Sequence, residues 1–339
     1  MLKGNEVIYQ IFVRNYSFEG TFKKVQEDLP RLKELGVDII YLLPIHEIGI
    51  KERKGTFGSP YAIKDYYSIS SDLGTLDDFI SLVNEVHKLG MKIILDMVFN
   101  HTSPDSVIMD EHPEYYFYKN GKPGNRVGDW SDIIDLDTHR EDTQDYLVNV
   151  LKYWASLGVD GFRFDVASMV DFAVFKKARD ILGKEIIFIG ESVDPGFAKY
   201  LIQIKDYYTP DIEMFPVFDG LYNYSWFRVF EQFIKKEVSY QELLAAIEED
   251  EKLLNGKGLR INCMENHDND RVAYYLDDKK LELVANLFAT IKGPLFLYMG
   301  QEYGIKHKPA LFEKDPVIWK ENNRVLEIYR KAIKIKHFQ

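Results

Sequence analysis

The feature that most constrains the fold is a phrase that recurs along the chain. An amphipathic run ends in Leu-Gly and is followed at once by a short apolar run, at Leu35-Gly36, Leu89-Gly90, Leu157-Gly158 and Leu182-Gly183. Glycine ends helices because it adopts the left-handed cap conformation without strain. Continuous apolar runs are typical of strands that are covered on both faces, as in a parallel sheet. Helix, glycine cap and buried strand in repetition predict an α/β architecture.

Eight such apolar runs can be counted. Eight strands that alternate with helices favour a closed (β/α)8 TIM barrel over an open doubly wound sheet. No G-x-G-x-x-G motif or phosphate-binding loop follows any of them, which argues against a nucleotide-binding sheet. The predicted strands are Val7–Val13, Asp38–Leu43, Lys92–Phe99, Gly161–Asp165, Ile186–Glu191, Ile212–Phe218, Arg260–Asn266 and Leu295–Met299.

Two connections are much longer than the rest. The segments 45–67 and 102–135 are rich in Gly, Pro, His, Asp and Tyr and lack helical periodicity. Loops of that length inside a compact domain usually form functional lids or small subdomains. We therefore predict a catalytic barrel made of residues 1–101 and 136–339, with residues 102–135 inserted as a small domain after the third strand.

Composition excludes several classes of protein. The 339 residues carry a net charge of −11 and a single cysteine, Cys263. One cysteine excludes a disulfide framework and a multi-cysteine metal site, and the negative charge disfavours nucleic acid or anionic membranes as partners. The N-terminal stretch MLKGNEVIYQ lacks the apolar core of a signal peptide, and no apolar run approaches the roughly 18 residues of a membrane span. We expect a cytoplasmic protein with no nucleic-acid or membrane partner.

Acidic residues stand at the ends of four predicted strands: Asp96, Asp165, Glu191 and Asp268. A single Asp after a strand is most simply a helix cap. Four carboxylates on four strands instead favour a functional site, because the chemistry of a TIM barrel sits at the carboxyl ends of its strands.

Neighbouring residues suggest how the carboxylates differ. Arg163 precedes Asp165 by two residues, so both side chains point the same way and the arginine favours the ionised form of Asp165. Glu191 follows the apolar run IIFIG, an approach that favours a protonated carboxyl. An acid paired with an anionic nucleophile is the arrangement used for glycoside hydrolysis, whereas the absence of a G-x-S-x-G elbow disfavours a serine hydrolase.

Four segments at the ends of predicted strands form a recognisable set: DMVFNH (Asp96–His101), GFRFDVASM (Gly161–Met169), GES (Gly190–Ser192) and ENHD (Glu265–Asp268). They resemble the four signature regions of the α-amylase family, glycoside hydrolase family 13, and occur in the family's order. Three further stretches are similar to the family, so the resemblance covers essentially the whole chain: SPYAIKDYY (Ser59–Tyr67), IDLDT (Ile134–Thr138) and YMGQE (Tyr298–Glu302).

The resemblance implies roles for individual residues. Asp165 would be the nucleophile, Glu191 the acid/base, and Asp268 the third carboxylate, which holds substrate hydroxyls. Segment 102–135 would be the family's domain B. Tyr61 would stack beneath the cleaved sugar, and the residues expected to bind substrate are Tyr61, His101, Arg163, His267 and Asp96.

The implied activity is that of a retaining α-glycosidase. It would hydrolyse α-glucosidic links in starch-like glucans or malto-oligosaccharides through a covalent glycosyl-Asp intermediate. A 4-α-glucanotransferase or related transglycosylase that uses the same intermediate is an alternative reading. A catalytically silent carbohydrate-binding barrel is a non-enzymatic alternative, disfavoured because Asp165, Glu191, Asp268 and Arg163 are all present.

The chain also departs from the family. Many family α-amylases have Lys-His where this chain has Ser168-Met169. Val166, directly after the implied nucleophile, resembles members that cut α-1,6 links. The chain ends after a helical segment, 324–337, where the family usually adds an antiparallel β domain, so we expect no C-terminal β domain in this chain.

The implied domain B is short, which bears on the family's calcium. Asn100 and Asp135 match calcium-ligand positions, but calcium takes six to eight oxygens. Asp129 and Asp132 lie nearby in sequence and would be the source of further ligands. We expect that no cofactor is required and that Asn100 and Asp135 are calcium ligands only if the ion is present.

Overall fold

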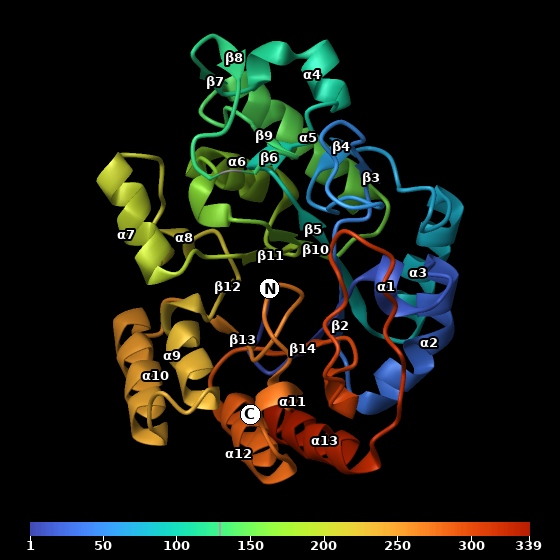
Figure 1. Ribbon diagram of the computed structural model, residues 1–339, viewed down its shortest axis with the longest axis vertical. Helices are drawn as coiled ribbons and strands as arrows, with labels where there is room; N and C mark the ends of the chain where they lie inside the picture. Colours follow the sequence, from blue (N-terminus) through green and yellow to red (C-terminus); the bar gives the residue numbers. More distant parts are fainter. Residues whose placement is uncertain (129) are drawn as a thin grey trace.

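The computed structural model describes residues 1–128 and 130–339; Asp129 lies outside the described residues. Eight parallel strands form a closed barrel in the order β1-β14-β13-β12-β11-β10-β5-β2. The prediction of a (β/α)8 TIM barrel is confirmed, and Figure 1 shows the strands at the centre of the molecule with helices around them. The barrel strands are β1 (Val7–Ile11), β2 (Ile39–Leu42), β5 (Lys92–Met97), β10 (Gly161–Phe164), β11 (Ile187–Gly190), β12 (Gly220–Tyr222), β13 (Arg260–Cys263) and β14 (Leu295–Tyr298).

The core has two layers. Side chains such as Ile8, Tyr41 and Ile94 pack together inside the barrel, and a larger apolar cluster fills the space between the strands and the helices. The helices are α1 (Val13–Tyr16), α2 (Phe22–Leu35), α3 (Leu76–Lys88), α5 (Glu141–Ser156), α6 (Phe172–Leu182), α7 (Pro195–Ile204), α8 (Asp211–Met214), α9 (Tyr224–Ile234), α10 (Tyr240–Leu254), α11 (Val272–Tyr275), α12 (Asp278–Thr290) and α13 (Asn323–His337), with 3-10 turns at Ala167–Met169 (η2) and Gln301–Tyr303 (η3).

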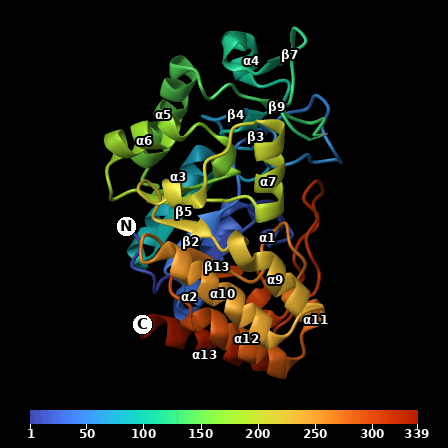
Figure 2. The same ribbon diagram turned by 90° about the vertical axis from the view of Figure 1, so that its left-hand side faces the viewer.

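Glycine has the capping role that the repeated phrase predicts. Gly36 ends α2 in the left-handed conformation, with φ of 102°, and its N–H bonds back to the last turn. Gly161 opens β10 where a Cβ would lie 2.5 Å from the carbonyl oxygen of Ile187, so the close approach of β10 to β11 requires glycine. The turned view in Figure 2 shows helices α9, α10, α12 and α13 side by side around the lower part of the barrel.

The sixth strand is where the sequence prediction was wrong. The apolar run Ile212–Phe218 contains helix α8 and a turn, and the strand β12 comes after it at Gly220–Tyr222. Pro216 interrupts the run, because proline has no N–H to give to a strand ladder. The ring of Phe218 packs 4.8 Å from that of Phe175, so the run is apolar because it covers the barrel, without joining the sheet. The other predicted strands exist, with ends that differ by at most three residues.

The two long connections lie together near one end of the barrel. Segment 45–67 contains the hairpin β3 (Glu47–Ile48) and β4 (Ile63–Asp65). The predicted insertion forms a lobe, residues 102–135, at the top of Figure 1. Its first and last residues lie in an antiparallel pair, in which His101 is opposite Asp135. The boundaries of the insertion stay a prediction. The strand that leads into the lobe is β6 (His101–Thr102), and the elements that follow are α4 (Val107–Glu111), a 3-10 turn at Pro113–Tyr115 (η1), β7 (Tyr118–Lys119), β8 (Lys122–Pro123) and β9 (Ile134–Asp135).

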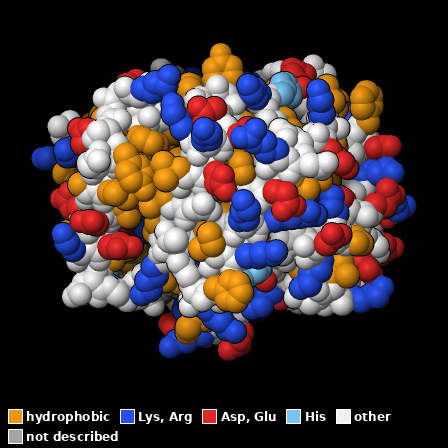
Figure 3. All heavy atoms as spheres, turned by 90° about the horizontal axis from the view of Figure 1, so that it is seen from below, with side chains coloured by type: hydrophobic (Ala, Val, Ile, Leu, Met, Phe, Trp, Pro, Cys, Tyr) orange, Lys and Arg blue, Asp and Glu red, His pale blue; other side chains and the backbone are white. Residues whose placement is uncertain are grey.

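Figure 3 presents the lower face of the molecule, on which charges of both signs occur. Basic and acidic side chains are interspersed there among apolar and neutral ones. Among the described residues, no helix is both long enough and apolar enough to cross a membrane.

Candidate active site

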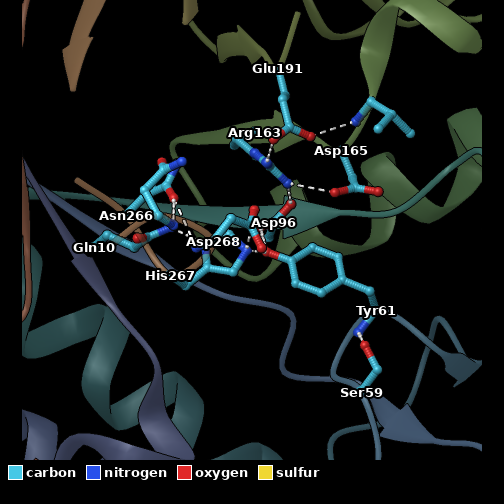
Figure 4. A network of polar contacts seen from close by, with 12 residues as sticks. Gln10, Ser59, Tyr61, Asp96, Arg163, Asp165, Glu191, Asn266, His267 and Asp268 are labelled. Atoms are coloured by element: carbon cyan, nitrogen blue, oxygen red, sulfur yellow. Dashed lines mark hydrogen bonds and ion pairs between the residues drawn. The ribbon is translucent and has the colours of Figure 1, made fainter. Parts of the chain in front are cut away.

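The centre of the site is the guanidinium of Arg163, which is 1% exposed. Its Nη1 lies 2.7 Å from Asp96 Oδ1 and 3.0 Å from Asp165 Oδ1. Its Nη2 lies 2.8 Å from Glu191 Oε1. Figure 4 shows these carboxylates arranged around the one guanidinium. Three of the four carboxylates that stand at predicted strand ends therefore converge on a single cation.

The barrel itself creates this convergence. Arg163 of β10 is directly opposite Asp96 of β5, and β11 on the other side of β10 leads into Glu191. Asp165 follows the last residue of β10. Val166 then adopts a left-handed backbone with φ of 36°, which is uncommon and strained for a β-branched residue. In that turn its N–H donates to Glu191 Oε2 at 2.9 Å.

A second chain of hydrogen bonds fixes Tyr61 and His267. Gln10 Nε2 donates to His267 Nδ1 at 3.1 Å, so a neutral imidazole carries its proton on Nε2. That N–H donates to the oxygen of Tyr61 at 2.7 Å, and the Tyr61 hydroxyl donates to Asp96 Oδ2 at 2.9 Å. The two rings are stacked, with centroids 5.3 Å apart. The tyrosine is therefore held by both its ring and its hydroxyl (Figure 4).

Burial controls the protonation of the site. It raises the pKa of Asp165 well above its usual range; the Arg163 guanidinium opposes this, and the neighbouring carboxylates add to it. The pKa of Asp268, whose side chain is 50% exposed at the edge of these buried groups, is also raised, against the opposing charges of Arg163 and Lys308. Burial lowers the pKa of His267 to about 3, which keeps that ring neutral. Because the carboxyls surround one guanidinium, they titrate as an interacting group and share protons among them.

Two adjoining cavities meet at the carboxylates. A cavity of about 300 Å³, the Tyr61 cavity, is lined by Tyr61, His101, Asp165 and His267, among others. A second cavity of about 520 Å³, the Tyr224 cavity, is lined by Phe197, Tyr224 and Phe227, among others. Four residues line both cavities, and they mark the junction: Trp130, Val166, Glu191 and Asp268.

Most of the predicted site residues reach the cavities. Asp165, Glu191, Asp268, Tyr61, His101 and His267 all line the Tyr61 cavity. Asp96 and Arg163, predicted to bind substrate, are not among the described residues that line either cavity. Their side chains are 0% and 1% exposed, and Asp96 accepts hydrogen bonds from Tyr41, Tyr61 and Arg163. That these two residues bind substrate stays a prediction.

Several lining residues were not predicted. Trp130 comes from the lobe, Lys54 from the loop between β3 and β4, and Phe312 from the segment after η3. Tyr224 follows the strand whose position was mispredicted, and its hydroxyl lies 3.4 Å from Glu191 Oε1. For the aromatic residues among them, the sequence offered one general signal, an aromatic content of 14%, which does not indicate which aromatic residues line a cavity.

The residues at the calcium-like positions do not fit a calcium ion. Arg126 Nη2 donates to Asn100 Oδ1 at 2.8 Å, and Arg126 Nε lies 3.3 Å from Asp135 Oδ2. One oxygen of each residue is therefore bound by an arginine side chain, while Asp135 Oδ1 has no hydrogen-bond partner among the described residues. Asp132 instead pairs with Lys54, and Asp129 lies outside the described residues. Among residues 1–128 and 130–339, no group of three or more His, Cys, Asp or Glu side chains is arranged to hold a metal.

Comparison with known proteins identifies the family of the chain. The family described as alpha amylase, catalytic domain, matches residues 5–132, 127–181 and 174–334. The crystal structure of an alpha-amylase from Lactobacillus plantarum is 38% identical over 98% of this chain and 80% of that one, with a TM-score of 0.94. That of a maltogenic alpha-amylase, AmyB, from Thermotoga neapolitana is 33% identical over 100% of this chain and 78% of that one, with a TM-score of 0.88.

A curated relative, Alpha-amylase 2 of Dictyoglomus thermophilum, is 26% identical over 97% of this chain, which spans 62% of the relative's length. The chain belongs to the α-amylase family of glycoside hydrolases. The resemblance inferred from the sequence is confirmed.

Proposed function

We propose that this chain hydrolyses α-glucosidic links in α-glucans or malto-oligosaccharides with retention of configuration. The observation that carries the proposal is the contact of one guanidinium, that of Arg163, with both Asp165 and Glu191 beside the Tyr61 cavity. Two carboxyls held by one guanidinium favour the short separation, about 5–5.5 Å, that a retaining glycosidase needs. The relatives' names, which include alpha-amylase and oligo-1,6-glucosidase, support an α-glucan as substrate.

In the first step the Asp165 carboxylate attacks the anomeric carbon of the sugar. The bond from that carbon to the leaving oxygen breaks, and Glu191 gives its proton to that oxygen. The 3.0 Å contact from Arg163 Nη1 to Asp165 Oδ1 favours the negative charge on the nucleophile. The scheme requires that Asp165 is ionised and that Glu191 carries a proton when the sugar binds.

In the second step Glu191, now a carboxylate, takes a proton from water. The water oxygen bonds to the anomeric carbon as the bond to Asp165 breaks, which restores the α configuration. Asp268 lines the same cavity beside His267, with His267 Nε2 3.2 Å from Asp268 Oδ2. It would accept hydrogen bonds from the hydroxyls of the sugar, and Tyr61 would offer a flat apolar face to the ring.

Trapping the intermediate tests the proposal. A 5-fluoro-α-glucosyl fluoride, which forms the glycosyl-enzyme faster than it turns over, should add one fluorosugar to the peptide that contains Asp165, as read by mass spectrometry. Proton NMR of early hydrolysis should show the α anomer first. A first product in the β configuration, or label on any other residue, would refute the retaining mechanism at Asp165.

Transfer to a sugar hydroxyl is a second candidate, favoured by the Tyr224 cavity. That cavity lies on the Glu191 side, and its aromatic residues Phe197, Tyr224 and Phe227 suit a second sugar in the acceptor position. The ratio of free glucose to longer oligosaccharides at high substrate concentration separates the two activities. A ratio that falls steeply with concentration indicates a transglycosylase such as a 4-α-glucanotransferase.

A further inference from the structure

Arg126 joins the inserted lobe to the barrel through buried polar contacts. It lies between β8 and β9, and its side chain is 9% exposed. Its backbone N–H donates to Asp135 Oδ2 at 2.8 Å and its Nη2 to Asn100 Oδ1 at 2.8 Å. Asp135 and Asn100 are both 0% exposed. A buried carboxylate needs a counter-charge, and Arg126 provides it.

The same contacts continue toward the active site. The Asn100 amide that accepts from Arg126 through Oδ1 donates through Nδ2 to His101 Nδ1, 3.2 Å away. His101 lines the Tyr61 cavity. The hydrogen bond to Nδ1 leaves the proton of the neutral ring on Nε2, and it fixes the orientation of the ring.

From these contacts we propose that Arg126 is a built-in cation that replaces a metal ion at the junction of lobe and barrel, and a positioning residue for His101. Guanidinium is suited to this position because its fixed fork of donors can engage an amide oxygen and a carboxylate at once. The enzyme would then need no calcium for the geometry of its substrate cavity. The expected effect on KM rests on the proposed hydrolysis. The expected effects on calcium dependence and on Tm do not.

The test compares Arg126→Met and Arg126→Lys with the wild type. Wild-type Tm and activity should be the same in EDTA and in added calcium. Arg126→Met should lower Tm by about 4–7 °C, the size expected when one partner of a buried ion pair is lost. Its KM should rise about tenfold while kcat changes little, because His101 contacts substrate and the reacting carboxyls are untouched. Arg126→Lys should recover most of the KM.

Arg140→Met is the matched control, because Arg140 pairs with Asp142 at an exposed site, and it should leave Tm and KM unchanged. A wild-type enzyme that loses Tm or activity in EDTA and regains it with calcium would overturn the inference. An Arg126→Met enzyme with wild-type Tm and KM would overturn it too. If Arg126→Met does not fold, the effect of EDTA on the wild type and the KM of Arg126→Lys still test the inference.

A different set of residues lines the Tyr61 cavity without reaching the Tyr224 cavity. Lys54 Nζ lies 2.7 Å from Asp132 Oδ1 and 6.0 Å from the centre of the Phe312 ring. We refer to Lys54, Asp132 and Phe312 as the Lys54 bridge. Its members come from the β3–β4 loop, the lobe and the segment after η3, and all three line the Tyr61 cavity while none lines the Tyr224 cavity.

The Lys54 bridge is anchored on both sides. Asp132 has only 7% of its side chain exposed, so its pairing with Lys54 is partly shielded from solvent. On the other side the Phe57 N–H donates to the Phe312 carbonyl at 3.0 Å, and the Thr56 N–H donates to Glu313 Oε1 at 3.0 Å. Backbone hydrogen bonds therefore hold the loop of Lys54 against the segment of Phe312.

The chemistry of the proposed reaction indicates which part of the substrate lies in each cavity. Asp165 bonds to the sugar that is retained, so that sugar lies in the Tyr61 cavity, whereas the leaving group departs past Glu191 into the larger Tyr224 cavity. We infer that the Lys54 bridge closes the non-reducing end of the cleft, so that the enzyme releases short sugars from chain ends. This inference rests on the proposed hydrolysis and narrows it to chain-end action.

The test uses maltoheptaose and the same sugar with a 4,6-O-ethylidene group on its non-reducing end. The wild type should cleave the free sugar and leave the blocked one intact. Lys54→Ala should gain cleavage of the blocked sugar by about tenfold or more. Lys64→Met, which removes a more exposed pair with Glu47 between the strands of the same hairpin, should behave as wild type.

The outcomes are distinguishable. Equal cleavage of both sugars by the wild type overturns chain-end action but leaves the proposed hydrolysis intact. If Lys54→Ala cleaves the blocked sugar no better than the wild type does, the proposed role of the Lys54 bridge is overturned. Cleavage of neither sugar by the wild type contradicts the proposed hydrolysis itself.

Discussion

Replacing Asp165 with asparagine should abolish turnover and yet stabilise the fold at neutral pH. The Asp165 side chain is 12% exposed and has one cationic partner, Arg163, which it shares with Asp96 and Glu191. Burial raises its pKa, so the folded protein disfavours the ionised form. Asparagine keeps the shape and can still accept from Arg163, but it removes the charge.

The sign of the effect follows from proton linkage. The folded pKa of Asp165 lies above the unfolded value of about 3.9, so the folded state binds more protons than the unfolded state between the two values. Stability is therefore lost as the pH rises through that window, and the whole cost is present above the folded pKa. Asp165→Asn removes the cost, so its advantage should grow from nothing below about pH 3.9 to its full size once the pH exceeds the folded pKa.

The expected size is modest for stability and large for catalysis. Removing an unfavourable buried charge typically raises the free energy of unfolding by about 0.5–2 kcal/mol. For 339 residues the unfolding entropy is about 0.7 kcal/mol/K, so the Tm should rise by about 1–3 °C. Loss of the nucleophile should reduce kcat by more than the ~10²–10⁴ that acid–base help alone provides.

The assay is urea unfolding at pH 7 and pH 3.5, together with kcat on a nitrophenyl maltoside. Asp180→Asn is the control, because Asp180 is exposed on α6, and it should change neither quantity. A variant that is less stable than wild type at pH 7, or equally stabilised at both pH values, would show that the charge of Asp165 is not the source of the cost. Retained turnover would refute its role as nucleophile.

Three further predictions follow from the same contacts. Glu191→Gln should lower kcat on malto-oligosaccharides by about 10²–10⁴ but much less on α-glucosyl fluoride, whose leaving group needs no proton; equal losses on both substrates would contradict the role of Glu191 as acid. Tyr61→Ala should lower kcat/KM by an amount equivalent to about 1–3 kcal/mol through loss of a stacking face, and an unchanged kcat/KM would make Tyr61 a packing residue. Burial lowers the pKa of His46 to about 4, whereas its pKa in the unfolded state is near 6.5. Between these two pH values the unfolded state binds more protons than the folded state. The free energy of unfolding should therefore decrease as the pH falls from 6.5 to 4, by up to about 1.4 kcal/mol per pH unit. Urea unfolding across that range should show a shallower loss for His46→Gln, and an identical slope would refute the reasoning.

The sequence by itself determined the architecture and which carboxylates meet at one end of the barrel, because both depend on local patterns. A Leu-Gly phrase before an apolar run is enough to end a helix and begin a buried strand, as Gly36 does with its φ of 102°. Once the strands are parallel, their carboxyl ends meet at one face. The positions of Asp165, Glu191 and Asp268 at strand ends were therefore sufficient to bring them together.

Only the tertiary structure decided which groups touch. That Arg163 contacts three carboxylates, and that the Asp96 side chain is fully buried beside it, depends on the register of β5, β10 and β11. The run Ile212–Phe218 looked like a strand because covering a barrel and joining it demand the same apolar side chains.

The contacts across the lobe lie even further beyond the reach of local patterns. Arg126 meets Asn100 across 26 residues of sequence, and Lys54 meets Asp132 only because the hairpin and the lobe fold against one another. No periodicity along the chain encodes such pairs, since each forms between segments whose relative position is set by the packing of the whole domain.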